Sequence, residues 1–153
     1  MIHIAIMKKD WGLIQKILSG EKTIETRWYK HKAKPWDCIK KGETIYFKDS
    51  GSPVTVKAKV SQVEQYEDLD EEKTREILAK YSQKDLGTSN ISSEILEYIN
   101  GKKYAIIVHL INPQKIKPFN IDKRGFGAMS AWLCVTSEEL KKLQKPLVLT
   151  NSL

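Results

Sequence analysis

The sequence has few of the residues that build disulfide and metal sites. Its two cysteines, Cys38 and Cys134, lie far apart in the chain and form no CxxC motif. This excludes the zinc-knuckle and thioredoxin-type patterns. The three histidines are scattered, and we expect His3 and His109, which fall in predicted strands, to be core or edge residues. We therefore expect no metal site and no cofactor.

Long apolar runs are also missing. None approaches the roughly 20 residues that a membrane-spanning helix needs, and residues 1–10 lack the pattern of a signal peptide. We expect a cytoplasmic protein with reduced thiols and no membrane contact. The motifs GxxxxGK[ST], HExxH and GxSxG are absent as well, which excludes P-loop nucleotide hydrolases, zincin proteases and nucleophile-elbow hydrolases.

Charge is abundant and unevenly distributed. The chain carries 26 Lys and Arg against 19 Asp and Glu, a net charge of +7. Residues 1–48 hold eleven bases and five acids, and residues 101–125 hold six bases and one acid. Residues 64–76 hold seven acids and two bases. If the two basic segments meet in space, they would attract a polyphosphate backbone, while the acidic stretch 64–76 could contact a protein partner. The alternative is that these charged faces are simply solvated.

Hydrophobic periodicity predicts more strands than helices. The 153-residue length fits one domain spanning residues 1–153, and no repeat or linker divides it. We expect an α+β fold, a small mixed sheet curled into a partial barrel with three or four short flanking helices. Strands are predicted at 2–7, 23–29, 44–48, 54–61, 104–111, 114–121 and 131–135, and helices at 10–20, 70–81, 92–99 and 138–142.

One junction between a helix and a strand combines charge and aromatic residues. It reads Gly-Glu-Lys-Thr-Ile-Glu-Thr-Arg-Trp-Tyr over residues 20–29. Strand parity places Glu25 and Arg27 on one face and Trp28 on the other. Lys22 can join the Glu25 face if it lies in the turn before the strand. The three charges would then line one pocket; the alternative is a surface ion pair worth little energetically.

This segment resembles the signature of the ASCH family, a branch of the PUA-like superfamily. The family motif G-x-K-x-x-E-x-R is matched by Gly20, Lys22, Glu25 and Arg27, and Trp28 extends the match. The clear likeness covers residues 1–65. It implies a PUA-like mixed β pseudobarrel with a cleft between the barrel and its helices. It also implies that the ligand is RNA or a nucleotide-like small molecule.

The resemblance gives the motif residues their expected roles. Lys22 and Arg27 would bind phosphate or a base edge, and Glu25 would orient Arg27 or accept a hydrogen bond from a base amino group. If the protein is an enzyme, Lys22 and Glu25 are its catalytic candidates.

Five further residues complete the predicted binding site. Tyr29 shares the Glu25 face and could stack on a base, whereas Trp28 could either stack or belong to the core. Lys48 and Ser50, at the tip of a predicted hairpin, could close the cleft. Arg124 belongs to the stretch 123–132, which could form a second wall of the groove or only a turn into the last strand.

The resemblance leaves two functions open, RNA binding and hydrolysis. Some ASCH proteins resemble amidohydrolases that deacylate N4-acylcytidines, and others resemble ribonucleases. The amidohydrolase branch uses a Lys and a Thr of the motif and a later Glu. This chain keeps the Lys as Lys22 but has Glu25 at the Thr position, which favours binding. Candidates for the later acid are Glu64, Glu67, Glu71 and Glu72.

Overall fold

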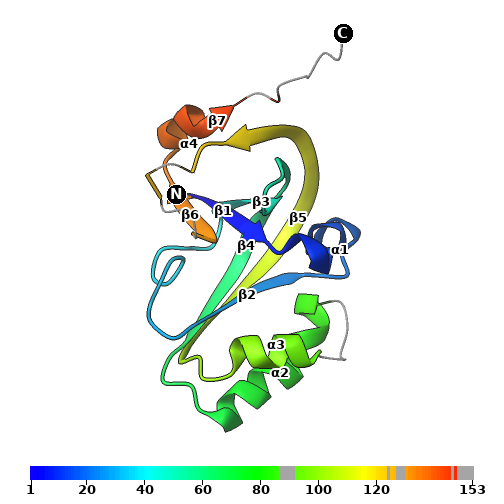
Figure 1. Cartoon of the computed structure of the whole chain (residues 1–153), viewed down its shortest axis with the longest axis vertical. Helices are drawn as coiled ribbons and strands as arrows, with labels where there is room; N and C mark the ends of the chain where they lie inside the picture. The colour runs from blue at the N-terminus through cyan, green and yellow to red at the C-terminus, as the bar shows by residue number, and fades with distance from the viewer. Residues whose placement is uncertain (87–91, 124, 127–129, 146, 148–153) are drawn as a thin grey trace.

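The computed structural model describes residues 1–86, 92–123, 125–126, 130–145 and 147. Strands and helices follow one another along the chain in a mixed order (Figure 1). They are β1 (Ile2–Met7), the 3₁₀ turn η1 (Lys9–Trp11), α1 (Leu13–Ser19), β2 (Ile24–Tyr29), β3 (Thr44–Asp49), β4 (Val54–Tyr66), α2 (Glu71–Leu86), α3 (Ser93–Ile99), β5 (Tyr104–Ile121), β6 (Trp132–Val135), α4 (Ser137–Leu143) and β7 (Gln144–Lys145).

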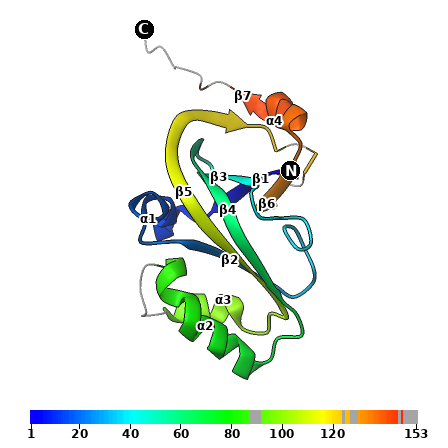
Figure 2. The same ribbon diagram turned by 180° about the vertical axis from the view of Figure 1, so that it is seen from behind.

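The strands form one curled mixed sheet in the order β2-β5-β4-β3-β1-β6, and β7 pairs with β5. Within this path only β1 and β3 run parallel. The long strands β4 and β5 cross the molecule together, and β5 bends over at its far end (Figures 1 and 2). This is the predicted α+β architecture: a half-barrel with, in the described part of the chain, four α-helices around it.

Successive side chains along the strands point into different apolar clusters. The inside of the curl holds Phe47, Val56, Ile106 and Val108, covered by Ile14 and Ile17 of α1. The other face of β2 and β5 packs under α2 and α3, which lie together against that end of the sheet (Figures 1 and 2). A third cluster lies under α4. Because β2 contributes to two clusters, its odd and even positions face different environments.

Some predicted boundaries were wrong. The predicted helix start at Asp10 is a 3₁₀ turn, and Gly12 separates it from α1 with a left-handed φ of 61°. Residues 104–111 and 114–121 form one strand, not two. Pairing with β4 continues along β5 past Pro113. The register of this pairing shifts between Lys57 and Lys59 of β4, opposite Asn112 of β5, whose φ is 53°.

Among the described residues, the structure contains no helix with the length and apolar character needed to cross a membrane.

Candidate functional site

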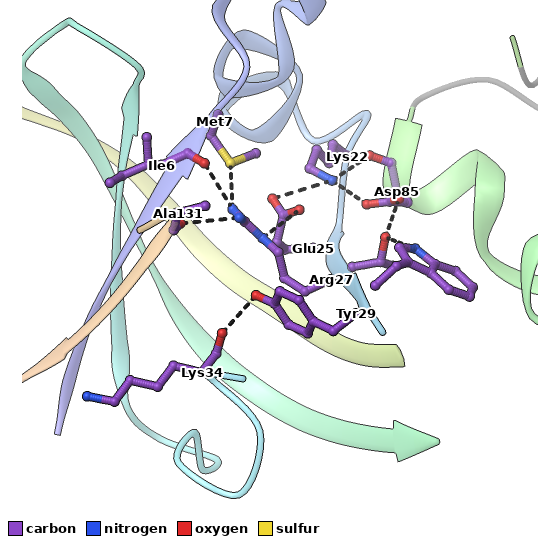
Figure 3. Close-up of polar contacts among 11 residues, drawn as sticks. Ile6, Met7, Lys22, Glu25, Arg27, Tyr29, Lys34, Asp85 and Ala131 are labelled. Atoms are coloured by element: carbon purple, nitrogen blue, oxygen red, sulfur yellow. Dashed lines mark hydrogen bonds and ion pairs between the residues drawn. The ribbon is translucent and has the colours of Figure 1, made fainter. Parts of the chain in front are cut away.

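Lys22 lies at the junction between α1 and β2, and its whole side chain is buried. Gly20 ends α1 in a left-handed conformation with φ 84°, a geometry that a residue without Cβ adopts freely. The Lys22 backbone N–H then bonds the Lys16 carbonyl at 2.9 Å. Lys22 is only 1% exposed. Its Nζ donates to the Asp85 backbone carbonyl at 2.6 Å and to the Asp85 carboxylate (Figure 3).

Asp85 was not foreseen as part of this site. It lies near the end of α2, 63 residues from Lys22 in the sequence. Its second carboxylate oxygen accepts a hydrogen bond from Thr26 Oγ1 at 2.7 Å, and Trp28 Nε1 donates to the same Thr26 oxygen at 3.1 Å. Asp85 thus fixes both Lys22 and the β2 strand to α2. No sequence motif marks the pair, because only the fold brings the end of α2 to this junction.

Glu25 lies between the two cations of the motif. Its carboxylate is 3.8 Å from Lys22 Nζ through one oxygen and 3.8 Å from Arg27 Nε through the other (Figure 3). Burial raises the pKa of Glu25, while the nearby charges of Lys22 and Arg27 act in the opposite direction. Within the described chain, Glu25 Oε2 and Arg27 Nε are buried and have no hydrogen-bond partner. Buried polar atoms are normally satisfied, so these two are candidates for ligand contact.

Arg27 spans the two edges of the curled sheet. It projects from the edge strand β2, and its Nη atoms donate to the Ala131 carbonyl at 3.2 Å and the Ile6 carbonyl at 3.3 Å (Figure 3). Its guanidinium also lies 5.1 Å from the centre of the Trp132 ring. We name this gap, between β2 on one side and β1 and β6 on the other, the seam.

A pocket of about 140 Å³ opens at the seam. Glu25 and Arg27 form part of its lining, together with Thr26 and the end of β1. Two aromatic residues, Trp11 and Tyr98, line it as well. Lys8 lies beside both rings, with Nζ 4.6 Å from the Trp11 ring centre and 5.5 Å from that of Tyr98. Charged groups, aromatic rings and a surface cation therefore surround one small cavity. The full lining is Ile6, Met7, Lys8, Trp11, Leu13, Glu25, Thr26, Arg27, Tyr98 and Ala131.

The structure brings together the three charges of the motif, whereas the two aromatic residues after them lie elsewhere. Trp28 is 4% exposed and packs in the core with Ile24 and Ile77. Trp28 is therefore a core residue, the alternative that strand parity had left open, and its ring is not exposed for stacking on a base. Tyr29 faces the same side as Glu25, but its hydroxyl donates to the Lys34 carbonyl at 2.7 Å (Figure 3). Burial raises the pKa of Tyr29 to about 12. Neither residue lines the pocket.

Two of the other predicted residues, Lys48 and Ser50, lie outside the pocket. Lys48 is buried near the end of β3, and burial together with Lys123 lowers its pKa. Ser50 is exposed in the turn after β3. Arg124 lies outside the described residues. Lys48 and Lys123 come from the two basic segments, so those segments do approach each other at one point.

None of the four predicted later acids lies at Lys22. Glu64 of β4 pairs in register with Ile107, which pairs with Thr26, so Glu64 shares the Thr26 face of the sheet and not the Glu25 face. It bonds His109 Nε2 at 2.7 Å and accepts a hydrogen bond from Tyr81 at 2.6 Å. The acid that pairs with Lys22 is Asp85, which was not among the four candidates.

Comparison with known proteins places the fold in a recognised class. The crystal structure of ASCH from Zymomonas mobilis superposes with a TM-score of 0.64 at 18% identity, covering 95% of this chain and 96% of that one. A variant of the same protein gives 0.67 at 19% identity, covering 92% of each chain. The N-terminal domain of Staphylothermus marinus McrB gives 0.51 at 13% identity, covering 93% of this chain and 92% of that one. No curated protein matches the chain.

The curled half-barrel with its flanking helices is a PUA-like fold, a class associated with RNA binding. The ASCH domain family matches residues 7–119, more than half of the chain. The chain therefore belongs to the ASCH domain family.

Proposed function

We propose that this chain binds RNA or a nucleotide-like ligand and that one base of the ligand enters the seam pocket. The observation that carries the proposal is the pair of buried polar atoms, Glu25 Oε2 and Arg27 Nε, that lack hydrogen-bond partners in the described chain beside this cavity. Leaving such atoms unsatisfied costs about 1–3 kcal/mol each, a cost that a bound base would remove.

The size of the pocket supports a single base as the inserted group. Its 140 Å³ is below the roughly 300–1,000 Å³ of sites that enclose a whole drug-sized ligand. The sugar and phosphates would therefore remain at the mouth. Lys8 is exposed there and supplies a cation for phosphate, while the Trp11 and Tyr98 rings supply stacking surfaces.

The hydrogen-bonding groups of the pocket favour bases with an amino group. When it is ionised, the state that the charges of Lys22 and Arg27 favour, the Glu25 carboxylate only accepts hydrogen bonds. It then matches the exocyclic amine of cytosine, adenine or guanine and repels the carbonyls of uracil, which has no amino group. The Lys22 ammonium is tied to Asp85, and its role in this proposal is to hold Glu25 in place.

Binding is tested by fluorescence anisotropy with a labelled single-stranded RNA oligomer. We expect Tyr98→Ala to weaken binding by about 5-fold to 150-fold, because stacking on an aromatic side chain contributes about 1–3 kcal/mol per base. Leu96→Ala is the matched control, since Leu96 is exposed on the same helix and lies outside the pocket lining. Equal affinity of the two variants and the wild type would contradict the proposal.

Base preference gives a second test. Free cytidine and adenosine should displace the RNA better than uridine in the wild type. Glu25→Gln should narrow this difference, since an amide both donates and accepts. A preference unchanged by Glu25→Gln would mean that the base does not meet this carboxyl group.

Hydrolysis of a modified nucleoside or of RNA is a second candidate function, favoured by the burial that raises the pKa of Glu25. A carboxyl group with a raised pKa, in a pocket beside two cations, is suited to general acid–base catalysis. Incubation with N4-acylcytidines and with labelled RNA tests it. Turnover by the wild type that Glu25→Gln abolishes would support hydrolysis, and binding without turnover would leave the binding function alone.

A further inference from the structure

One imidazole and two thiols converge where β1, β6 and the loop after β2 meet. His3 of β1 lies directly opposite Cys134 of β6 in the antiparallel register. Cys38 comes from the loop between β2 and β3, which passes beside β6 (Figures 1 and 2). One ligand-type atom from each of the three residues lies within 4.8 Å of the other two. Among the described residues no other such group of His, Cys, Asp or Glu side chains occurs.

The hydrogen bond between His3 and Glu43 leaves the unprotonated Nδ1 of His3 on the side of the thiols. Glu43 Oε1 lies 2.9 Å from His3 Nε2. Because an ionised carboxylate can only accept, this bond assigns the proton to Nε2 and leaves Nδ1 unprotonated. His3 Nδ1 lies 3.4 Å from Cys134 Sγ. A carboxylate behind a histidine in this way is the usual arrangement that orients a metal-binding imidazole.

We infer that His3, Cys38 and Cys134 form a zinc-binding site, with Glu43 orienting the histidine. Two thiolates and an imidazole are ligands that zinc prefers. Tetrahedral zinc with Zn–S near 2.3 Å and Zn–N near 2.05 Å separates sulfur from nitrogen by about 3.6 Å. The observed 3.4 Å between Cys134 Sγ and His3 Nδ1 is close to that separation. Three protein ligands leave the fourth position for water or a solute.

The burial of the three residues differs, and zinc binding would release their thiol protons. His3 is fully buried and Cys134 is 7% exposed, whereas Cys38 is partly exposed and provides the approach from solvent. Binding breaks two S–H bonds and forms two Zn–S bonds and one Zn–N bond. Two protons leave to solvent and no electrons are transferred.

Trp132 competes with the metal for the same lone pair. Its Nε1 donates to His3 Nδ1 at 3.1 Å, and this hydrogen bond must break when zinc binds. Removing the donor should therefore strengthen zinc binding, whereas removing the Glu43 carboxylate should weaken it. The two substitutions have opposite expected effects on one measured quantity, which a purely structural role of the cluster would not produce.

The test is a zinc titration of the reduced, chelator-treated protein in competition with a chromogenic zinc chelator. We expect one zinc ion per chain and about two protons released per ion, the latter measured calorimetrically in buffers of different ionisation enthalpy. Co²⁺ should give the intense visible bands of a tetrahedral site and thiolate-to-metal charge transfer in the near ultraviolet.

Variants identify the ligands. Cys38→Ser, in a partly exposed loop position, should abolish stoichiometric uptake, and Cys134→Ser should do the same if it folds. Glu43→Gln should weaken zinc binding by about 10-fold to 100-fold, and Trp132→Phe should tighten it. His31→Gln is the matched control, since His31 is an exposed histidine of the same loop, and its zinc affinity should equal that of the wild type.

Thermal unfolding gives a readout that does not depend on the competing chelator. Zinc should raise the melting temperature of the wild type and leave that of Cys38→Ser unchanged, since a ligand that binds only the folded state stabilises it. Uptake below one equivalent by the reduced wild type, or equal uptake by Cys38→Ser, would overturn the inference. The inference would also be overturned if Cys38 and Cys134 form a disulfide on exposure to peroxide while the reduced protein takes up no zinc.

Discussion

At the scale of single residues, the seam site is a buried arrangement of alternating charges. Lys22 and Arg27 flank Glu25, and Asp85 lies beyond Lys22. Burying charged groups is costly unless each has partners, and here each cation meets at least one acid. Asp85 matters most in this arrangement, because it supplies both hydrogen-bond acceptors of the buried Lys22 ammonium.

We predict that Asp85→Ala lowers the free energy of unfolding by about 3 kcal/mol, because removing one partner of a buried ion pair leaves the other charge uncompensated. Urea denaturation at neutral pH measures the change. The double substitution Lys22→Met with Asp85→Ala should cost less than the sum of the single substitutions, because the two residues interact directly.

Gln83→Ala provides the control for the Asp85 prediction, since Gln83 is exposed on the same helix and its truncation should change stability little. An Asp85→Ala variant as stable as Gln83→Ala would show that Lys22 finds another partner or is solvated.

Strand parity predicted much of this site at the residue scale. The alternation along residues 24–29 correctly placed Glu25 and Arg27 on one face and Trp28 with Ile24 on the other. It could not predict Asp85, Trp11 or Tyr98. These residues reach the site through tertiary contacts between segments that are distant in the sequence, and such contacts leave no local pattern.

At the scale of elements, Glu64 joins three parts of the fold. It extends from β4 and is bonded by Tyr81 of α2 and His109 of β5, while Tyr66 donates to its other oxygen at 2.9 Å. Burial alone would raise the pKa of Glu64. The hydrogen bonds from His109, Tyr81 and Tyr66 outweigh burial, so the pKa is lowered below its ordinary value.

We predict that Glu64 makes the attachment of α2 to the sheet sensitive to acid. A carboxyl group with a lowered pKa in the folded state stabilises the fold above its unfolded pKa of about 4.3. This contribution is lost as the pH falls through the folded-state pKa. The melting temperature of the wild type should therefore fall more steeply below about pH 4.5 than that of Glu64→Gln.

Glu72→Gln is the control for this pH dependence, because Glu72 is exposed in the first turn of α2. It should follow the wild-type profile. Parallel profiles for Glu64→Gln and the wild type over this pH range would refute the proposed role of Glu64.

Element types were easier to predict than element lengths. The alternating run 54–61 predicted a strand with one exposed face, and β4 does begin at Val54, but it continues to Tyr66. The extra residues pair with β5 from Tyr66↔Ala105 to Gln62↔His109. Backbone pairing with a partner strand extends both strands beyond what their own side-chain patterns indicate, because the hydrogen bonds are made between the strands.

At the scale of the whole molecule, the acidic stretch 64–76 satisfies many of its charges internally. Glu64 bonds His109, Glu67 lies 3.7 Å from Lys32, and Glu71 accepts a hydrogen bond from Arg75 at 2.7 Å. The stretch is therefore partly structural. We propose that only its exposed acids could contact a protein partner.

If the chain binds RNA as proposed, its net charge of +7 should make that binding dependent on salt, and Lys8 is the exposed cation that lines the seam pocket. Each phosphate neutralised on a single strand contributes about −0.7 to the slope of log affinity against log salt concentration. We predict a clearly negative slope for the wild type and a slope about 0.7 shallower for Lys8→Ala, measured by anisotropy with one RNA oligomer across salt concentrations.

Lys73→Ala is the control, because Lys73 lies on α2 in an exposed ion pair with Glu76 at 3.5 Å, and it should keep the wild-type slope. A slope equally reduced in both variants would indicate a diffuse attraction to the whole basic surface. An unchanged slope in Lys8→Ala would place the phosphates away from the pocket mouth.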